Sequence, residues 1–168
     1  MEVIETERLV LRQQIAEDAP FILKLVNDPD WIKHIGDRGV RTIAQARAYI
    51  NDGAVAMYDQ HGFGLYLVET KPDRKPVGVC GLIQRDFLPD VDLGFALAPE
   101  HRSKGYAREA ATATIAYGKD VIGLDRITAI VSPGNSASIR LLKELDFTFD
   151  RTFDYPDSDK IHLFALDL

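Results

Sequence analysis

The chain of 168 residues has little cysteine and no long hydrophobic run, and each shortage excludes a class of protein. Its one cysteine, Cys80, cannot form a disulfide within the chain, so we expect a reducing, cytoplasmic setting. No apolar stretch approaches the roughly 20 residues that a membrane-spanning helix needs. The opening residues, MEVIETERLVLR, are acidic and alternate in polarity, unlike a secretory signal peptide. We therefore expect no membrane association and no secretion.

Positive charge is also scarce. The chain has 20 Lys and Arg residues against 26 Asp and Glu, a formal net charge of −6. Because nucleic-acid binding requires a broad basic surface, we expect no nucleic-acid partner. No His, Cys or carboxylate cluster has metal-ligand spacing, so we expect no metal. The length and the 46% hydrophobic content suit one globular domain, residues 1–168.

The hydrophobic period along the chain changes between helix and strand spacing, which predicts a mixed fold. The expected strands are 8–13, 61–70, 75–86, 89–99, 126–132, 147–153 and 160–168, and the expected helices are 16–28, 42–58, about 105–121 and 135–145. An irregular loop with Trp31 separates the first two helices. Short connections between 61 and 99 indicate an antiparallel meander. The order predicts a single α/β (α+β) domain, with a mixed, mostly antiparallel sheet of about seven strands and flanking helices.

The stretch HRSKGYAREA, residues 101–110, places three basic side chains around Gly105 at the start of a predicted helix. A helix N-terminus presents free backbone N–H groups and a partial positive charge. Glycine allows the backbone to approach an anion closely, so the stretch suits a phosphate or pyrophosphate. The alternative is a tight strand-to-helix turn with solvated charges. The chain has neither a Walker loop nor a Rossmann glycine fingerprint.

Four ordered stretches resemble the GNAT N-acetyltransferases, and in particular their RimJ/RimL branch. Residues 102–107, RSKGYA, are similar to the acetyl-CoA signature Q/R-x-x-G-x-G/A. TERLVLR resembles the opening strand of that branch, DLGFALAPEHRSKGYAREA its strand-loop-helix core, and NSASIRLLKELDF its N-x-x-S helix. The resemblance spans nearly the whole chain. It implies the GNAT fold, with a cleft where two central strands splay apart.

The resemblance also implies which residues hold acetyl-CoA. Backbone amides of Arg102, Ser103, Lys104, Gly105, Tyr106 and Ala107 would hold the pyrophosphate. Phe95, Ala96 and Leu97 would pair with the pantetheine arm and offer an N–H to the thioester carbonyl, and Asn135 would reach the pantetheine. Two positions depart from the family pattern. Ser103 stands where a second glycine is frequent, and Asp146 replaces a glycine at a position that favours a positive φ.

The catalytic groups are less clearly marked. Amine attack on a thioester needs a proton acceptor and a proton donor for the thiolate. Asp92 is similar in position to a glutamate of the branch and would accept the amine proton through water; the alternatives are a solvent-facing residue or a polar contact to the acceptor. The family's frequent tyrosine acid is replaced by Leu142. Ser138 is the nearest hydroxyl, although it is also suited to let the helix approach the cofactor; Tyr106 and Tyr155 are other candidates.

The expected activity is transfer of the acetyl group of acetyl-CoA to a primary amine, either a protein N-terminus or a small molecule. Trp31 and His34, in the loop between the first helices, are expected to line the acceptor site, and His34 is the second candidate for the base. Alternatives are an acyl-CoA-binding sensor or scaffold without catalysis, and a different anion such as a nucleotide at the glycine. The sequence leaves open the acceptor and the choice between monomer and homodimer.

Overall fold

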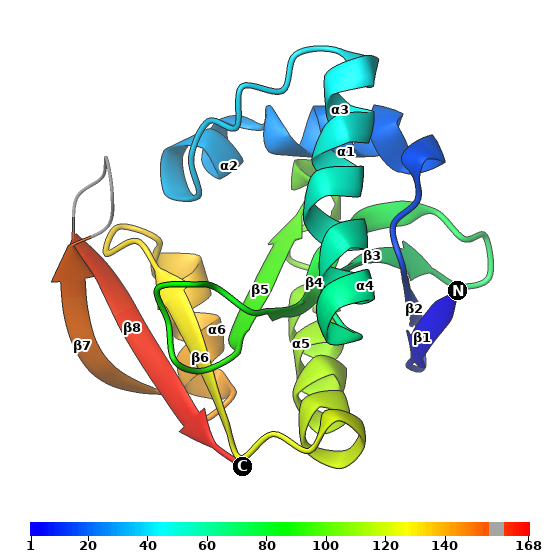
Figure 1. The fold of residues 1–168 in the computed structure, drawn as a ribbon. Helices are drawn as coiled ribbons and strands as arrows, with labels where there is room; N and C mark the ends of the chain where they lie inside the picture. The colour runs from blue at the N-terminus through cyan, green and yellow to red at the C-terminus, as the bar shows by residue number, and fades with distance from the viewer. Residues whose placement is uncertain (155–159) are drawn as a thin grey trace.

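A computed structural model describes residues 1–154 and 160–168, which form an eight-stranded sheet in the order β1-β2-β3-β4-β5-β6-β8-β7 (Figure 1). The strands are β1 (Glu2–Glu5), β2 (Leu9–Arg12), β3 (Leu65–Thr70), β4 (Pro76–Ile83), β5 (Asp92–Leu97), β6 (Arg126–Val131), β7 (Thr148–Asp154) and β8 (Lys160–Asp167). The helices are α1 (Ala19–Val26), α2 (Pro29–His34), α3 (Ile43–Ile50), α4 (Ala56–His61), α5 (Tyr106–Tyr117) and α6 (Ser136–Glu144).

The mixed, mostly antiparallel sheet confirms the predicted fold class. Every neighbouring pair of strands is antiparallel except β5 and β6, which are parallel. The expected number of strands was one too few, because the sequence pattern missed β1. This four-residue strand lies at the edge of the sheet and buries none of its residues fully, so it lacks a clear alternation of polarity.

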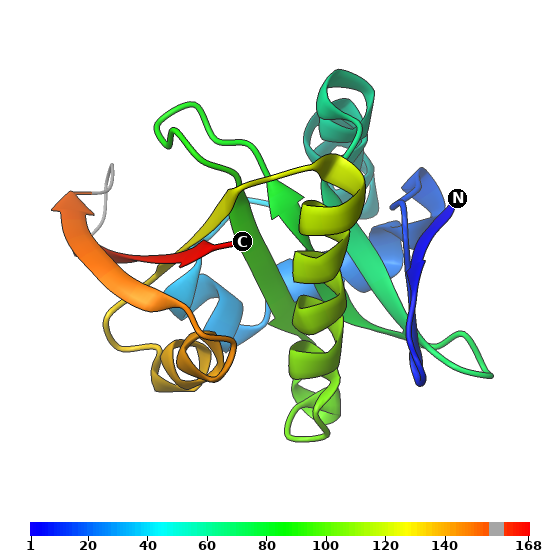
Figure 2. The ribbon, with the colours of Figure 1, turned by 90° about the horizontal axis from the view of Figure 1, so that it is seen from below.

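Helices cover both faces of the sheet (Figure 2). The alternation of side chains along each strand divides the core accordingly. Tyr66 and Cys80 belong to the cluster that packs against α5, whereas Leu67 and Val79 belong to the cluster beneath α1 and α3. Cys80 is only 1% exposed and is therefore part of the core, as the apolar strand around it predicted, and this burial raises the pKa of its thiol to about 12.

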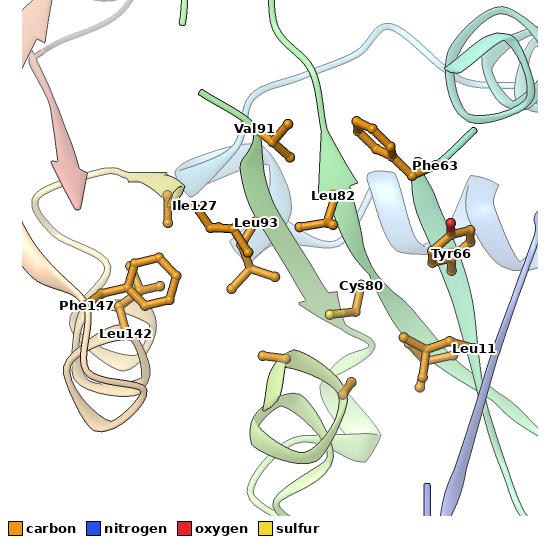
Figure 3. Close-up of a cluster of buried hydrophobic side chains, with 14 of the residues drawn as sticks. Leu11, Phe63, Tyr66, Cys80, Leu82, Val91, Leu93, Ile127, Leu142 and Phe147 are labelled. Atoms are coloured by element: carbon orange, nitrogen blue, oxygen red, sulfur yellow. The ribbon is translucent and has the colours of Figure 1, made fainter. Parts of the chain in front are cut away.

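The α5-side cluster also joins the two halves of the sheet. Leu93 of β5 and Ile127 of β6 are both nearly inaccessible, and they lie in the same cluster as Leu142 and Phe147 (Figure 3). Packing of these side chains fixes the sheet at the base of β5 and β6. Asp146 adopts a φ of 70° just before Phe147, which confirms the positive φ predicted for this position.

The segment between the first two long helices is partly helical, and here the prediction of an irregular loop was wrong. α2 begins after Asp28, whose carboxylate accepts the backbone N–H of Trp31 at 3.4 Å. Pro29 occupies the first helical position, where its missing N–H costs nothing. Asp28, the last residue of the first expected helix, is therefore the N-cap of α2 instead. No helix in residues 1–154 or 160–168 is long and apolar enough to cross a membrane.

Candidate active site at the fork between β5 and β6

β5 and β6 meet at one point and then separate, and we call this opening the fork. Their only register pair is Asp92 with Thr128. There, the Thr128 N–H donates to the Val91 carbonyl at 2.9 Å, and beyond it the Asp92 carboxylate accepts the N–H of Ile130 at 3.2 Å. A side chain thus takes the place of a strand carbonyl where the ladder stops. The splaying of the two central strands that the family resemblance implied is present.

Beyond Asp92, the edge of β5 that faces the fork has no partner strand among the described residues, although the Leu97 carbonyl accepts the Nε–H of Arg102 at 3.2 Å. On the other side, the Ala98 N–H donates to the carbonyl of Val77 in β4 at 2.9 Å, so Ala98 and Ala96 direct their backbone groups toward β4 and away from the fork. Phe95 and Leu97 alternate with them along the strand, so the backbone N–H and C=O groups of these two residues face the fork. Of the three residues expected to pair with pantetheine, Phe95 and Leu97 have the suitable backbone orientation, whereas Ala96 is engaged with β4.

The chain after β5 forms a corner of exposed N–H groups at residues 103–108. Ser103 has a φ of 63°, and Gly105, the N-cap of α5, has a φ of 82° and no side chain with which to cap the helix. The first helical amide with a backbone partner is that of Glu109, which donates to Gly105 at 3.1 Å. Left-handed residues before an uncapped helix N-terminus form a concave set of donors suited to an anion. The Arg102 amide lies outside this set because it donates to Pro99 at 3.3 Å.

A side-chain network from the turn between β1 and β2 supports this corner. Arg8 donates to Glu109 at 2.8 Å and to the Lys104 carbonyl at 2.9 Å, and its guanidinium lies 4.8 Å from the centre of the Tyr106 ring. Thr6 donates to the same Glu109 carboxylate at 2.5 Å. Sequence reasoning used TERLVLR only as a landmark. The structure gives it a physical role, because Thr6 and Arg8 hold a segment about 100 residues away.

Asp92 lies at the base of the fork and is only 1% exposed. Its second carboxylate oxygen accepts the Arg85 Nε–H at 2.8 Å, an ion pair that the sequence did not indicate. Burial raises the pKa of Asp92 to about 6, and the charge of Arg85 opposes part of that effect. The alternative of a solvent-facing strand residue is therefore wrong. Both oxygens contact protein donors, and the carboxylate is closed to water in this arrangement.

Across the fork, Asn135 is the N-cap of α6. Its side-chain oxygen accepts the backbone N–H of Ser138 at 3.3 Å, and both residues are half-buried. Leu142, which stands in place of the family tyrosine, is 1% exposed and belongs to the core. Tyr155, another candidate for the thiolate acid, lies outside the described residues.

α2 spans the open end of the fork. Trp31 is 7% exposed and packs in the cluster beneath α1 and α3, and its indole N–H has no hydrogen-bond partner within the described residues. His34 is half-buried, with Nδ1 3.2 Å from the hydroxyl of Ser132, the residue after β6. Trp31 therefore anchors α2, while His34 connects it to the far side of the opening.

The sequence from residue 8 to residue 148 matches the family model described as an acetyltransferase (GNAT) domain. The N-acetyltransferase p20 of Bacillus licheniformis is 34% identical over 152 residues, which cover 88% of this chain and 83% of the relative. The N-acetyltransferase YoaA of Bacillus subtilis is 31% identical over 147 residues, which cover 86% and 82%. The chain belongs to the GNAT family of acetyltransferases, and the resemblance seen in its sequence is confirmed.

Solved structures show the same fold along the whole chain. RimL, a ribosomal L7/L12 alpha-N-protein acetyltransferase in complex with coenzyme A, superimposes with a TM-score of 0.84 at 15% identity, covering 100% of this chain and 98% of RimL. The ribosomal-protein-S5-alanine acetyltransferase of Vibrio fischeri gives 0.76 at 19% identity, with 99% and 96% covered. A spermidine N-acetyltransferase SpeG chimera from Vibrio cholerae and hSSAT gives 0.77 at 18%, with 95% of each chain covered. These likenesses show that the chain has the same fold as these three acetyltransferases.

Proposed function

We propose that this protein transfers the acetyl group of acetyl-CoA directly to a primary amine, with both substrates bound at the fork. The observation that carries the proposal is the uncapped corner at residues 103–108, next to the unpaired edge of β5. A diphosphate fits the donors of the corner, and an amide-containing arm fits the backbone groups of Phe95 and the N–H of Leu97, which face the fork. Acetyltransferases of this family use acetyl-CoA, which has both features.

In the proposed reaction, the amine nitrogen bonds to the acetyl carbon as the carbon–sulfur bond breaks. The proton lost by the amine ends on the departing thiolate, so the products are an amide and the free thiol. The backbone N–H of Phe95 faces the fork and is the proposed donor to the thioester oxygen, where negative charge develops. Asn135 and Ser138 lie at the start of α6; Asn135 is assigned to the pantetheine and Ser138 to the thiolate.

For Asp92 the geometry favours a positioning role over direct proton transfer. Its contact with the Ile130 N–H joins β5 to β6 at the base of the fork, and its contact with Arg85 holds the carboxylate in that position. A base role would require the carboxylate to leave both partners and meet water. His34, which lies at the open end and is only half-buried, is the next candidate for receiving the amine proton.

Two classes of acceptor are proposed. The names of RimL and the S5-alanine acetyltransferase indicate protein N-termini, and that of SpeG indicates a polyamine. Both present a primary amine. α2, with Trp31 and His34, is the proposed acceptor wall because it spans the end of the fork opposite the base.

The test is calorimetric titration with acetyl-CoA, ATP and NAD, followed by turnover with spermidine and with peptides that begin with Ala or Ser. We expect the protein to bind acetyl-CoA but neither ATP nor NAD. With at least one of the amines, we expect turnover that releases the free thiol of coenzyme A. Tight binding without turnover across the panel would favour the sensor or scaffold. Preferential binding of ATP or NAD would refute the assignment of the corner to coenzyme A.

A further inference from the structure

The side chain of Arg102 does not point to the anion-binding corner that follows it in the sequence. Its Nη1 lies 2.6 Å from the carboxylate of Asp30, and its Nη2 lies 2.7 Å from that of Asp28. Its Nε donates to the carbonyl of Leu97, the last residue of β5, at 3.2 Å. One planar guanidinium therefore joins the end of β5, the start of the corner and the first turn of α2.

This linkage is partly shielded from solvent. The side chain of Asp28 is 8% exposed and that of Arg102 is 36% exposed. Asp28 also caps α2 through the N–H of Trp31, so the same carboxylate starts the helix and receives Arg102. Charge-assisted hydrogen bonds are stronger than hydrogen bonds between neutral groups. Because the guanidinium group of arginine is planar and rigid, it fixes the orientation of its partners as well as pairing with their charge.

We propose that Arg102 is a positioning residue that couples the acetyl-CoA corner to α2. This inference rests on the proposed function, in which residues 103–108 hold the diphosphate and α2 walls the acceptor site. A ligand that fixes the corner also fixes the backbone of Arg102, and through two carboxylates it fixes α2. His34 then holds the other end of α2 to Ser132 beyond β6. Cofactor binding thus prepares the acceptor wall.

Hydrogen exchange with coenzyme A as the probe tests this coupling without a known acceptor. The reporters are the amide of Ile32 in α2 and those of Ile35 and Gly36 just after it. The Ile32 N–H donates to the Asp28 carbonyl, and the other two donate to the Trp31 carbonyl. In the wild type, coenzyme A should slow exchange both at residues 103–109 and at these reporters. In Arg102→Gln, it should still slow residues 103–109 and should leave the reporters unaffected. Without ligand, the reporters of the variant should exchange about tenfold faster or more, the effect of losing one charge-assisted hydrogen bond.

Two further variants separate coupling from a local loss of stability. Asp28→Asn combined with Asp30→Asn removes the same ion pairs from the α2 side, and it should also abolish the response of the reporters to coenzyme A. Lys24→Gln is the matched control. It removes an exposed ion pair at 3.3 Å with Glu100, which joins α1 to the residues before the corner, and it should leave the response intact.

The outcomes distinguish this proposal from the proposed function. If coenzyme A binds the wild type but does not slow the reporters, or slows them equally in Arg102→Gln, the coupling is refuted while the cofactor site stands. Failure of coenzyme A to bind the wild type refutes both. With an amine that the wild type acetylates, Arg102→Gln should raise the acceptor KM more than the Kd of coenzyme A, and Arg102→Lys should restore part of the difference.

Discussion

Replacing Gly105 with alanine tests whether the corner before α5 binds an anion or only turns the chain. Gly105 has a φ of 82°, and a Cβ built there would meet Nη2 of Arg8 at 3.2 Å. Gly123, after the end of the α5 segment, has a φ of 85° and no neighbour within 4 Å of a built Cβ. Alanine at either position suffers similar backbone strain, but only Gly105 lies in the proposed site. Gly123→Ala is therefore the matched control.

The expected sizes follow from this geometry. A left-handed alanine costs roughly 1–2 kcal/mol. The loss of glycine's freedom in the unfolded chain offsets about 0.5–1 kcal/mol. Both variants should therefore lose up to about 1.5 kcal/mol of unfolding free energy, a decrease in Tm of up to about 6 °C for a domain of this size. In Gly105→Ala, the added Cβ and the shifted N–H groups should remove at least one hydrogen bond to the diphosphate. The Kd of acetyl-CoA should therefore increase about tenfold or more.

Calorimetry gives the Kd of acetyl-CoA, and thermal unfolding of the free proteins gives the stability. We expect the two variants to be alike in stability and different in Kd. Equal Kd values in wild type and Gly105→Ala, with the loss of stability present, would mean that Gly105 only serves the turn. A weakened Kd in Gly123→Ala would mean that the change in affinity reflects general destabilisation.

Three further changes have separate readouts. Ser103→Gly relieves the backbone strain of a residue with a φ of 63°. It should stabilise the fold by about 0.5–1 kcal/mol without weakening the binding of acetyl-CoA. A loss of stability in thermal unfolding would show that Ser103 is not strained. Asn135→Ala removes the side chain that caps the Ser138 N–H. It should lower the unfolding free energy measured with denaturant by about 1 kcal/mol and should also weaken the binding of acetyl-CoA. Unchanged stability would argue against a capping role for Asn135. Asp92→Asn removes the ion pair with Arg85. Because the pKa of Asp92 rises from 3.8 to about 6 on folding, its contribution to stability falls as the pH increases through that window, so the variant should show a flatter pH dependence of unfolding there. The positioning role predicts that the acidic limb of its rate profile is retained, and loss of that limb would restore the base role.

The sequence by itself determined most of the helices and strands and the turn before α5, because both depend on local chemistry. Helix and strand spacing predicted most of the sheet and the long helices. Gly105 at the start of a helix predicted the anion-binding corner, and its conformation is a local property. Where local signals were weak the prediction failed. β1 is short and lies at an edge of the sheet. α2 starts at Asp28-Pro29, and the same pair of residues is also compatible with the end of the preceding helix.

Only the tertiary structure decided which side chains meet around the fork. Arg102 was expected among the phosphate-binding residues by position, but its guanidinium reaches Asp28 and Asp30, more than 70 residues earlier in the chain. Asp92 has a strand position that suits either solvent or the core, and its ion pair with Arg85 depends on how the loop between β4 and β5 folds back. Hydrophobic periodicity specifies a face, and it contains no information on which charged partner another segment brings to that face. That choice is made when the segments pack, because burying a charge is favourable only where a partner arrives with it.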